Sequence, residues 1–161
     1  MKNYELAIAK YYSKLKIIPT PLISWDIFSS QQNEILLFNS FQKEWKSKEH
    51  FFEIVHKQKK SVIITNSHFE IVFATENIIK MNGYFPSEIV GKSPKIFQGS
   101  LTSDITKEII KEAIISKKPF KEVILNYKKD GSTYFCEIEA YPKFNQQGNF
   151  INYIAFERKA S

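Results

Sequence analysis

The sequence contains one cysteine, Cys136, so neither an intramolecular disulfide nor a cysteine-rich metal site can form. This scarcity is typical of a reducing compartment. No apolar run is long enough to span a bilayer, and the first residues lack the apolar core of a signal peptide. The sequence therefore predicts a soluble, cytoplasmic protein with no membrane association.

Motifs that would indicate an enzyme are also missing. The histidines His50, His56 and His68 lack the spacing of metal ligands, and no glycine-rich phosphate loop or paired-carboxylate motif is present. The sequence ends just after its last expected strand, so we expect no attached kinase, cyclase or DNA-binding domain. A non-enzymatic module that acts through a partner protein, or as the sensor part of a longer protein, fits these observations.

Acidic residues are outnumbered by basic ones, 17 to 23, which gives a formal net charge of +6. Basic surfaces can bind nucleic acids through counterion release. The lysines do not form one block, however, because their clusters at 57–60, 117–118 and 128–129 fall at expected element ends, where solvated charges are common. We therefore expect no nucleic-acid partner.

Glycine is absent before Gly83, whereas large apolar side chains are frequent there. Apolar residues at helical spacing predict an amphipathic helix over residues 3–16. Ser29 or Ser30 could cap a second helix and Ser47 a third, because a serine hydroxyl accepts a hydrogen bond from the first helical turn. The apolar residues of these two helices are Ile35, Leu37, Phe38, Phe41 and Trp45, then Phe51, Phe52, Ile54 and Val55.

The apolar faces of this N-terminal helical extension need a partner surface. They could pack on the chain's own sheet or pair with a second subunit. The stripe over residues 4–15 and the group Phe38, Phe41 and Trp45 exceed what a small sheet would cover. We therefore expect a homodimer formed through the N-terminal helices and the sheet.

From residue 61 onward the apolar period changes to that of strands, which we expect near residues 62–65, 71–74, 123–127, 134–141 and 150–156. A hairpin turn is expected at Lys129, Asp130 and Gly131. Alternation along the strands then predicts which side chains share a face. The inner face should carry Ile124 and Asn126, then Cys136, Ile138 and Ala140. One face of the last strand carries Tyr153, Ala155 and Glu157.

The segment between the second and third strands is uneven. Three glycines and two prolines within residues 83–99 predict very short helices joined by turns. A longer helix over residues 101–116 should begin at Ser103 or its neighbours, because hydroxyl and acidic residues there favour a helix start. We expect its buried face to carry Ile105, Ile109, Ala113 and Ile114.

This order of elements resembles a PAS domain over residues 60–158. Gly83 and Tyr84, followed by the run from Ser87 to Lys92, are similar to the family's GY…EEIIGK segment. The resemblance implies an α+β fold, with a PAS-like five-stranded antiparallel sheet and short flanking helices. We expect the N-terminal helical extension to cover residues 1–58 and the PAS-like sensor domain residues 59–161.

Three further motifs resemble the flavin-binding light-oxygen-voltage (LOV) branch of this family: residues 97–99, 110–114 and 126–131. The resemblance implies a pocket that holds flavin mononucleotide. Gln98 and Asn126 match the branch's polar contacts. The remaining contacts are changed: Lys95 and Lys111 stand where the branch has phosphate-binding arginines, Cys136 where it has an asparagine, and Glu157 where it has a glutamine.

The branch's photochemical cysteine would fall at Pro94, which has no thiol, so a cysteinyl–flavin adduct is excluded. Ala155 narrows the pocket where the branch's pattern prefers glycine. Glu157 either points inward, where burial requires it to be paired or protonated, or lies in water near the strand end. Cys136 is expected to be a buried core residue rather than a reactive thiol.

We therefore expect a PAS-type sensory or protein-interaction module whose pocket is empty or holds a small molecule other than flavin. The two lysines would favour a phosphorylated or acidic planar ligand. The alternative is a LOV-like flavin-binding sensor without adduct chemistry.

Overall fold

The computed structural model describes residues 22–160, and their side chains from residue 32 onward. The helix expected over residues 3–16 lies outside this range. The chain from Glu34 onward forms one compact unit, and the part before it forms another. Within the described range, helix α2 covers Leu22–Phe41.

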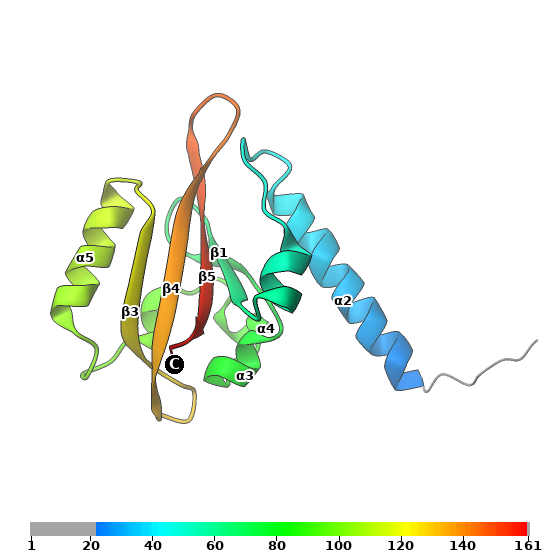
Figure 1. Cartoon of the computed structure of the whole chain (residues 1–161), viewed down its shortest axis with the longest axis horizontal. Coiled ribbons are helices and arrows are strands. Elements are labelled where there is room, and N and C mark those ends of the chain that lie inside the picture. Colours follow the sequence, from blue (N-terminus) through cyan, green and yellow to red (C-terminus); the bar gives the residue numbers. More distant parts are fainter. Residues whose placement is uncertain (1–21, 161) are drawn as a thin grey trace, which may run out of the picture. The chain divides into compact units, whose positions relative to one another are not determined.

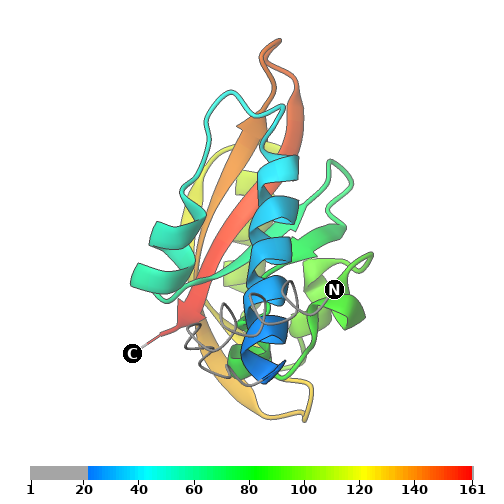
Figure 2. The ribbon, with the colours of Figure 1, turned by 90° about the vertical axis from the view of Figure 1, so that its right-hand side faces the viewer.

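A five-stranded antiparallel sheet forms the centre of the larger unit (Figure 1). Its strand order is β2-β1-β5-β4-β3, so the last strand lies between the first and the fourth. Figure 2 shows the long hairpin of β4 and β5 in orange and red. The expected α+β fold class is confirmed. The strand bounds are β1 (Ser61–Thr65), β2 (Ile71–Ala74), β3 (Phe120–Tyr127), β4 (Thr133–Phe144) and β5 (Phe150–Lys159).

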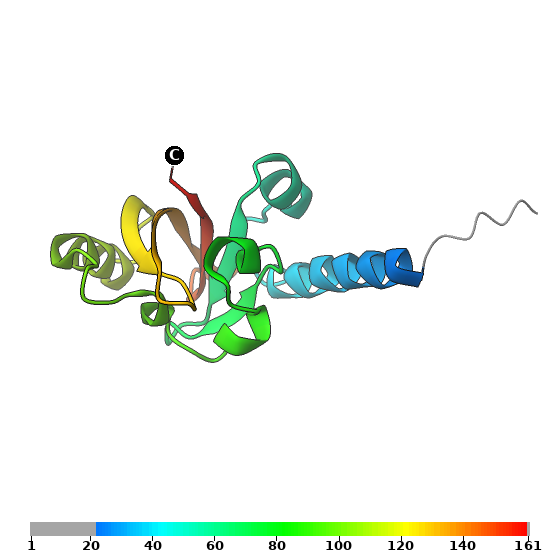
Figure 3. The ribbon, with the colours of Figure 1, turned by 90° about the horizontal axis from the view of Figure 1, so that it is seen from below.

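Short helices cover the inner face of this sheet, and the expected broken segment is confirmed. Gly83, at φ 81°, ends α3 in the left-handed conformation that glycine adopts without strain. α4 contacts β2 and α5 contacts β3. In Figure 3 the short green helices lie toward one edge of the sheet, and α5 lies beyond β3 at the other edge. The bounds are α3 (Ile78–Asn82), α4 (Pro86–Ile89), the 3₁₀ helix η2 (Pro94–Phe97) and α5 (Asp104–Ile115).

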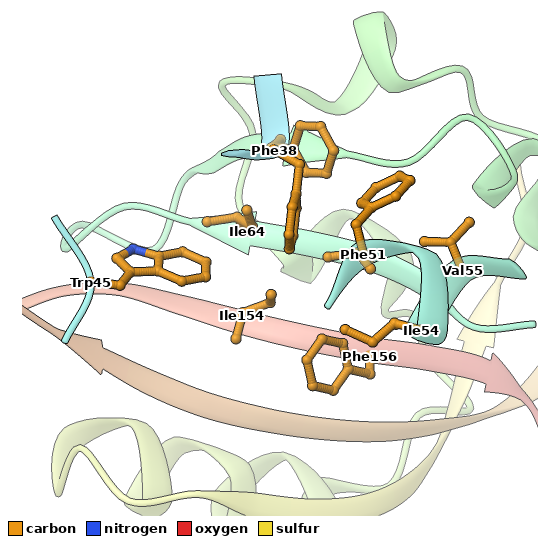
Figure 4. Packing of buried hydrophobic residues seen from close by; sticks show 10 residues of the cluster. Phe38, Trp45, Phe51, Ile54, Val55, Ile64, Ile154 and Phe156 are labelled. Carbon is orange, nitrogen blue, oxygen red and sulfur yellow. The ribbon is translucent and has the colours of Figure 1, made fainter. Parts of the chain in front are cut away.

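The outer face of the sheet is covered by the residues that precede β1. Phe38, Trp45 and Phe51 are buried against β1 and β5 (Figure 4). The Trp45 indole also donates a hydrogen bond of 2.9 Å to the Asn152 amide oxygen on β5. Phe38 and Trp45 pack on the chain's own sheet rather than on a second subunit, so these two residues no longer support a dimer.

The expected helix starts in this segment are wrong. Ser29 and Ser30 lie inside α2 rather than at a helix start, and Trp45 lies beyond the helix end at Phe41. The next helical stretch begins at Phe51 rather than after Ser47, and ends as the π-helix η1 (Glu53–Lys57).

Ser47 instead contacts a buried lysine. The Lys143 ammonium donates a 3.3 Å hydrogen bond to the Ser47 carbonyl and forms an ion pair with Glu49. It also lies 5.1 Å from the ring centre of Trp45. This lysine is 3% exposed and ties the segment after α2 to β4.

The buried face expected for α5 is only partly correct. Ile105 and Ile109 are 76% and 44% exposed. Ile110 and Ile114 face the sheet instead, because α5 covers an edge and presents a narrow stripe. The expected start is confirmed, since the Ser103 hydroxyl accepts a hydrogen bond from the Thr106 amide.

Candidate functional site

A cavity of about 100 Å³ lies between the inner face of the sheet and the helices η2 and α5. Its walls are mostly apolar, with side chains such as Ile63, Ile124 and Ile138 from the sheet and Ile110 and Ile114 from α5. Five polar side chains also line it: Thr65, Gln98, Asn126, Tyr153 and Glu157. The cavity is therefore apolar in the middle, with polar groups at defined positions.

Strand alternation places three of the expected site residues on the inner face. Asn126 and Cys136 are 3% and 0% exposed, and the register pairs Ile124 with Cys136 and Ile138 with Glu157. The expectation that Asn126 and Cys136 point inward is confirmed, and of the two positions left open for Glu157 the structure has the inward one. Asn126 and Glu157 line the cavity, while Cys136 lies beside Glu157.

The Glu157 carboxyl group is the least usual feature of the cavity. It is 5% exposed, and the Cys136 thiol, 3.7 Å from one carboxylate oxygen, is its hydrogen-bond partner. No lysine or arginine of residues 32–160 forms an ion pair with it. Burial raises the pKa of Glu157 to about 7, so the group changes charge near neutral pH.

Cys136 is not suited to nucleophilic chemistry. Burial, and next the negative charge of Glu157, raise the pKa of its thiol far above the usual range. A thiol that does not ionise is a weak nucleophile and a poor metal ligand. This agrees with the expectation of a core residue.

A second polar group lies next to this pair. The Tyr134 hydroxyl is buried near the Asn82 and Asn126 amides, yet no hydrogen bond of standard geometry reaches it within the described residues. The Asn82 amide nitrogen is equally without a partner there, although its oxygen accepts from the Tyr84 amide at 3.0 Å. Burial raises the pKa of Tyr134, so its hydroxyl stays neutral. The buried polar groups around Glu157 thus continue to Asn82 at the end of α3, outside the cavity lining.

The opposite end of the cavity contains residues that sequence reasoning missed. The Thr65 hydroxyl is buried without a hydrogen-bond partner in the described part of the chain. Phe69 has a φ of 61°, which is uncommon for a non-glycine residue. The Tyr153 hydroxyl contacts the Ala113 and Lys118 carbonyls at 3.1 and 3.0 Å, which ties the end of α5 to β5. Only alternation along β1 and β5 could have indicated Thr65 and Tyr153.

Besides Cys136, two of the expected site residues lie outside the cavity. Lys95 and Lys111 are exposed and do not line it. The Lys111 ammonium forms an ion pair of 2.8 Å with Glu108 on its own helix. Gln98, which follows η2 directly, does line the cavity. The expectation of an acidic or phosphorylated ligand depended on the two lysines, and the structure removes that support.

The residues present do not fit a flavin mononucleotide. Sites for ligands of drug size have volumes of about 300–1,000 Å³, several times that of this cavity. Pro94 lines the wall where the LOV resemblance places the photochemical cysteine, and no lysine of the described residues lines the cavity to hold a phosphate. At Glu157, a carboxyl group also stands where the LOV resemblance places a glutamine beside the flavin ring.

Two other classes of site were sought in the described part of the chain. No cluster of three or more histidine, cysteine, aspartate or glutamate side chains that could hold a metal ion occurs there. No helix between residues 22 and 160 combines the length and the apolar character needed to cross a membrane.

Known proteins similar to this chain are regulatory and light-responsive. The PAS domain family matches residues 59–158. A nitrogen fixation regulatory protein of Klebsiella oxytoca is 22% identical over 69% of this chain and 22% of its own length. A blue-light-activated histidine kinase of Brucella canis is 32% identical over 58% of this chain and 20% of its own length. The chain thus spans about a fifth of the length of these curated relatives.

The likeness extends to solved structures. One structure, concerned with a flavin analogue and the mechanism of a light-oxygen-voltage domain, superposes with a TM-score of 0.63 and 25% sequence identity. The superposition covers 66% of this chain and 82% of that one.

Proposed function

Because this chain belongs to the PAS domain family, we propose that it is a sensory module whose conformational state depends on a small molecule in the cavity beneath its sheet. Signalling proteins dominate its relatives, which supports this reading. The structural observation that carries the proposal is the position of β5. Its inner residues line the cavity and its outer residues form the other core.

Strand β5 gives a direct physical link between ligand and output. Ala155 and Glu157 line the cavity, whereas Ile154 and Phe156, alternating with them, pack on the outer face with Phe38 and Trp45. A ligand that shifts β5 slightly must therefore disturb the packing of Phe38 and Trp45 against the outer residues of this strand. Closely packed cores respond to such shifts by changing between discrete arrangements.

We further propose that the chain itself is not an enzyme. Cavity residues offer one carboxyl group, two amides and hydroxyl groups, but no arrangement of nucleophile, base and orienting group. The Cys136 thiol is buried and does not ionise. The kinase named among the relatives is about five times longer than the matched region, so its catalytic activity is not transferred to this chain.

Isoleucine methyl NMR tests the proposed function. Ile63, Ile124 and Ile138 line the cavity, while Ile64 and Ile154 pack on the outer face as matched controls. A cavity ligand from a library of small molecules should shift the first group strongly and the second group weakly. If no member of a broad library shifts the inner methyl groups, the proposed function is wrong.

Absorption spectroscopy tests the flavin alternative. We expect the purified protein to lack a flavin band after incubation with excess flavin mononucleotide and desalting, because the cavity is too small and lacks a phosphate-binding cation. A structured flavin band that survives desalting would favour the LOV-like alternative instead.

The domain division, location and partners of the chain are also proposals. We propose an N-terminal extension over residues 1–58, a sensor domain over residues 59–161, a cytoplasmic location and signalling through a partner protein. The family match from residue 59 supports the division. We keep the homodimer proposal on different residues: Leu36, Leu37, Phe52 and Phe135 are apolar and 51–67% exposed.

Light scattering over a range of concentrations tests the homodimer. Twice the monomer mass is expected, and replacement of Leu36 and Leu37 by aspartate should return the monomer mass with an unchanged circular dichroism spectrum. A monomer at high concentration for the unmodified chain would contradict the dimer.

A further inference from the structure

The geometry of the cavity points to a ligand of defined chemistry: we propose that it binds a slender aliphatic ammonium compound, with the ammonium group at Glu157. This inference rests on the proposed function and specifies the ligand of the same cavity. It differs from the acidic ligand that the sequence suggested, because the charged group inside the cavity is a carboxyl group and the lysines lie outside.

Among residues 32–160, no positively charged side chain forms an ion pair with Glu157. From β4 it faces the Cys136 thiol and the Tyr134 hydroxyl, and across the ladder to β1 it pairs with Ser61. Lys159, two residues further along β5, is exposed, and Tyr153 is the other titratable side chain that lines the cavity.

A buried carboxylate with only a thiol as partner is costly. An ammonium group offers three hydrogen-bond donors and the missing charge, so it can satisfy the carboxylate where an alcohol or an acid cannot. Asn126 and Gln98 line the same cavity and provide amide oxygens as further acceptors for those donors.

The shape of the cavity restricts the rest of the ligand. Glu157 and Tyr153 lie four positions apart on β5, which corresponds to roughly 13 Å along an extended strand. A volume of about 100 Å³ spread along such a path admits an unbranched chain and excludes a fused ring system. For comparison, a cavity of about 150 Å³ in another protein holds one benzene molecule.

The far end of the cavity has its own unpartnered group. Thr65 pairs with Tyr153 across β1 and β5, its hydroxyl lacks a hydrogen bond in the described residues, and its side chain lines the cavity at 6% exposure. Such a buried hydroxyl is stabilised by any ligand that offers it a hydrogen bond. A polar second end on the aliphatic ammonium compound should therefore increase affinity.

Isoleucine methyl NMR titrations with butylamine, butanol and butyric acid separate charge from shape, because the three probes share one chain length. Butylamine should bind at least about tenfold more tightly than the other two at about pH 8, since only it pairs with a carboxylate. The shifts should affect Ile63, Ile124 and Ile138 and spare Ile64 and Ile154.

The pH dependence gives an independent readout. Burial raises the pKa of Glu157 to about 7, whereas butylamine stays protonated far above that, so its affinity should rise about tenfold from about pH 6 to about pH 8. Glu157→Gln should abolish both the rise and the preference for the amine. Glu137→Gln is the matched control, because Glu137 lies on the outer face of β4 in an ion pair with Arg158.

If the Glu157→Gln variant does not fold, carbon NMR of the Glu157 carboxyl group in the unmodified chain replaces it. Bound butylamine should lower the pKa of Glu157. If the inner methyl groups report that butanol or butyric acid binds as tightly as butylamine or more tightly, the ammonium assignment is overturned and the proposed sensor function stays intact. Failure of all three probes, with binding of another compound from the library, would have the same meaning. Failure of every compound would overturn both.

Discussion

The Cys136 thiol lies 3.7 Å from a carboxylate oxygen of Glu157, and both side chains are almost completely buried on the inner face of the sheet. A thiol is a weak hydrogen-bond donor, so it does little to offset the removal of a carboxylate from water. This pair makes the charge of the cavity depend on pH within the physiological range.

Folding stability should therefore fall as the pH rises through neutrality. The Glu157 pKa is 4.5 unfolded and about 7 folded, so between these values the folded state holds a proton that the unfolded state has released. The free energy of unfolding should decrease across this interval and stay lower above it, by up to about 3 kcal/mol. Urea unfolding at about pH 5 and about pH 8 measures the change.

Glu157→Gln should remove most of this pH dependence and raise the stability above neutral pH, because an amide carries no charge. The comparison with the unmodified chain isolates Glu157 from other titrating groups. A slope that is identical in the two proteins would show that Glu157 is solvated or paired in solution.

Thr65→Val should stabilise the ligand-free protein by about 1 kcal/mol, since it removes a buried hydroxyl that has no partner. The matched control is Thr102→Val. The Thr102 hydroxyl is equally buried, but donates to the Leu125 carbonyl at 2.8 Å and accepts from the Gly99 amide at 3.0 Å. That substitution should cost about 1–3 kcal/mol in urea unfolding. Equal losses for both variants would contradict the assignment of Thr65.

Trp45→Ala should lower the free energy of unfolding by about 3–5 kcal/mol, because Trp45 is 1% exposed in the outer-face core and bonds to Asn152. Ile105→Ala, at a position 76% exposed, should change it by less than about 0.5 kcal/mol. Denaturant unfolding of both variants tests whether the segment before β1 is an integral part of the core. Similar small effects would indicate that it packs only loosely.

Sequence reasoning predicted the sheet well, because side chains alternate between the two faces of a strand, so the apolar pattern determines which residues share a face. Asn126, Cys136 and Glu157 follow from that alternation and the hairpin turn. It predicted the helices less well. Ile105 and Ile109 have the same spacing as Ile110 and Ile114, and only the position of α5 at the sheet edge decides which pair is buried.

The candidate site could be predicted only in part, for a related reason. Lys95 and Lys111 stand at the sequence positions of the LOV branch's phosphate-binding arginines. A long flexible side chain, however, adopts the conformation in which its charge is best solvated or paired, as Lys111 does with Glu108. The cavity size depends on packing among many side chains, which no motif encodes. Thr65 lacks a partner because of its neighbours in space, so no local pattern could reveal it.

The wall between η2 and α5 gives a last prediction, which concerns Gly99. A methyl group at this position would lie 2.5 Å from a ring carbon of Tyr127, closer than any van der Waals contact allows. The Tyr127 ring cannot move freely, because its hydroxyl accepts a 3.0 Å hydrogen bond from the Leu101 amide and lies 3.2 Å from the Ser100 hydroxyl. Gly99→Ala should therefore cost about 1–3 kcal/mol through overpacking.

A double-mutant cycle checks this cause. In a Tyr127→Ala background the added methyl group meets no ring, so Gly99→Ala should cost less than about 0.5 kcal/mol in urea unfolding. The difference between the two backgrounds measures the steric coupling itself. If the cost of Gly99→Ala is the same with and without the Tyr127 ring, its origin is the backbone at position 99 and not a clash with the ring.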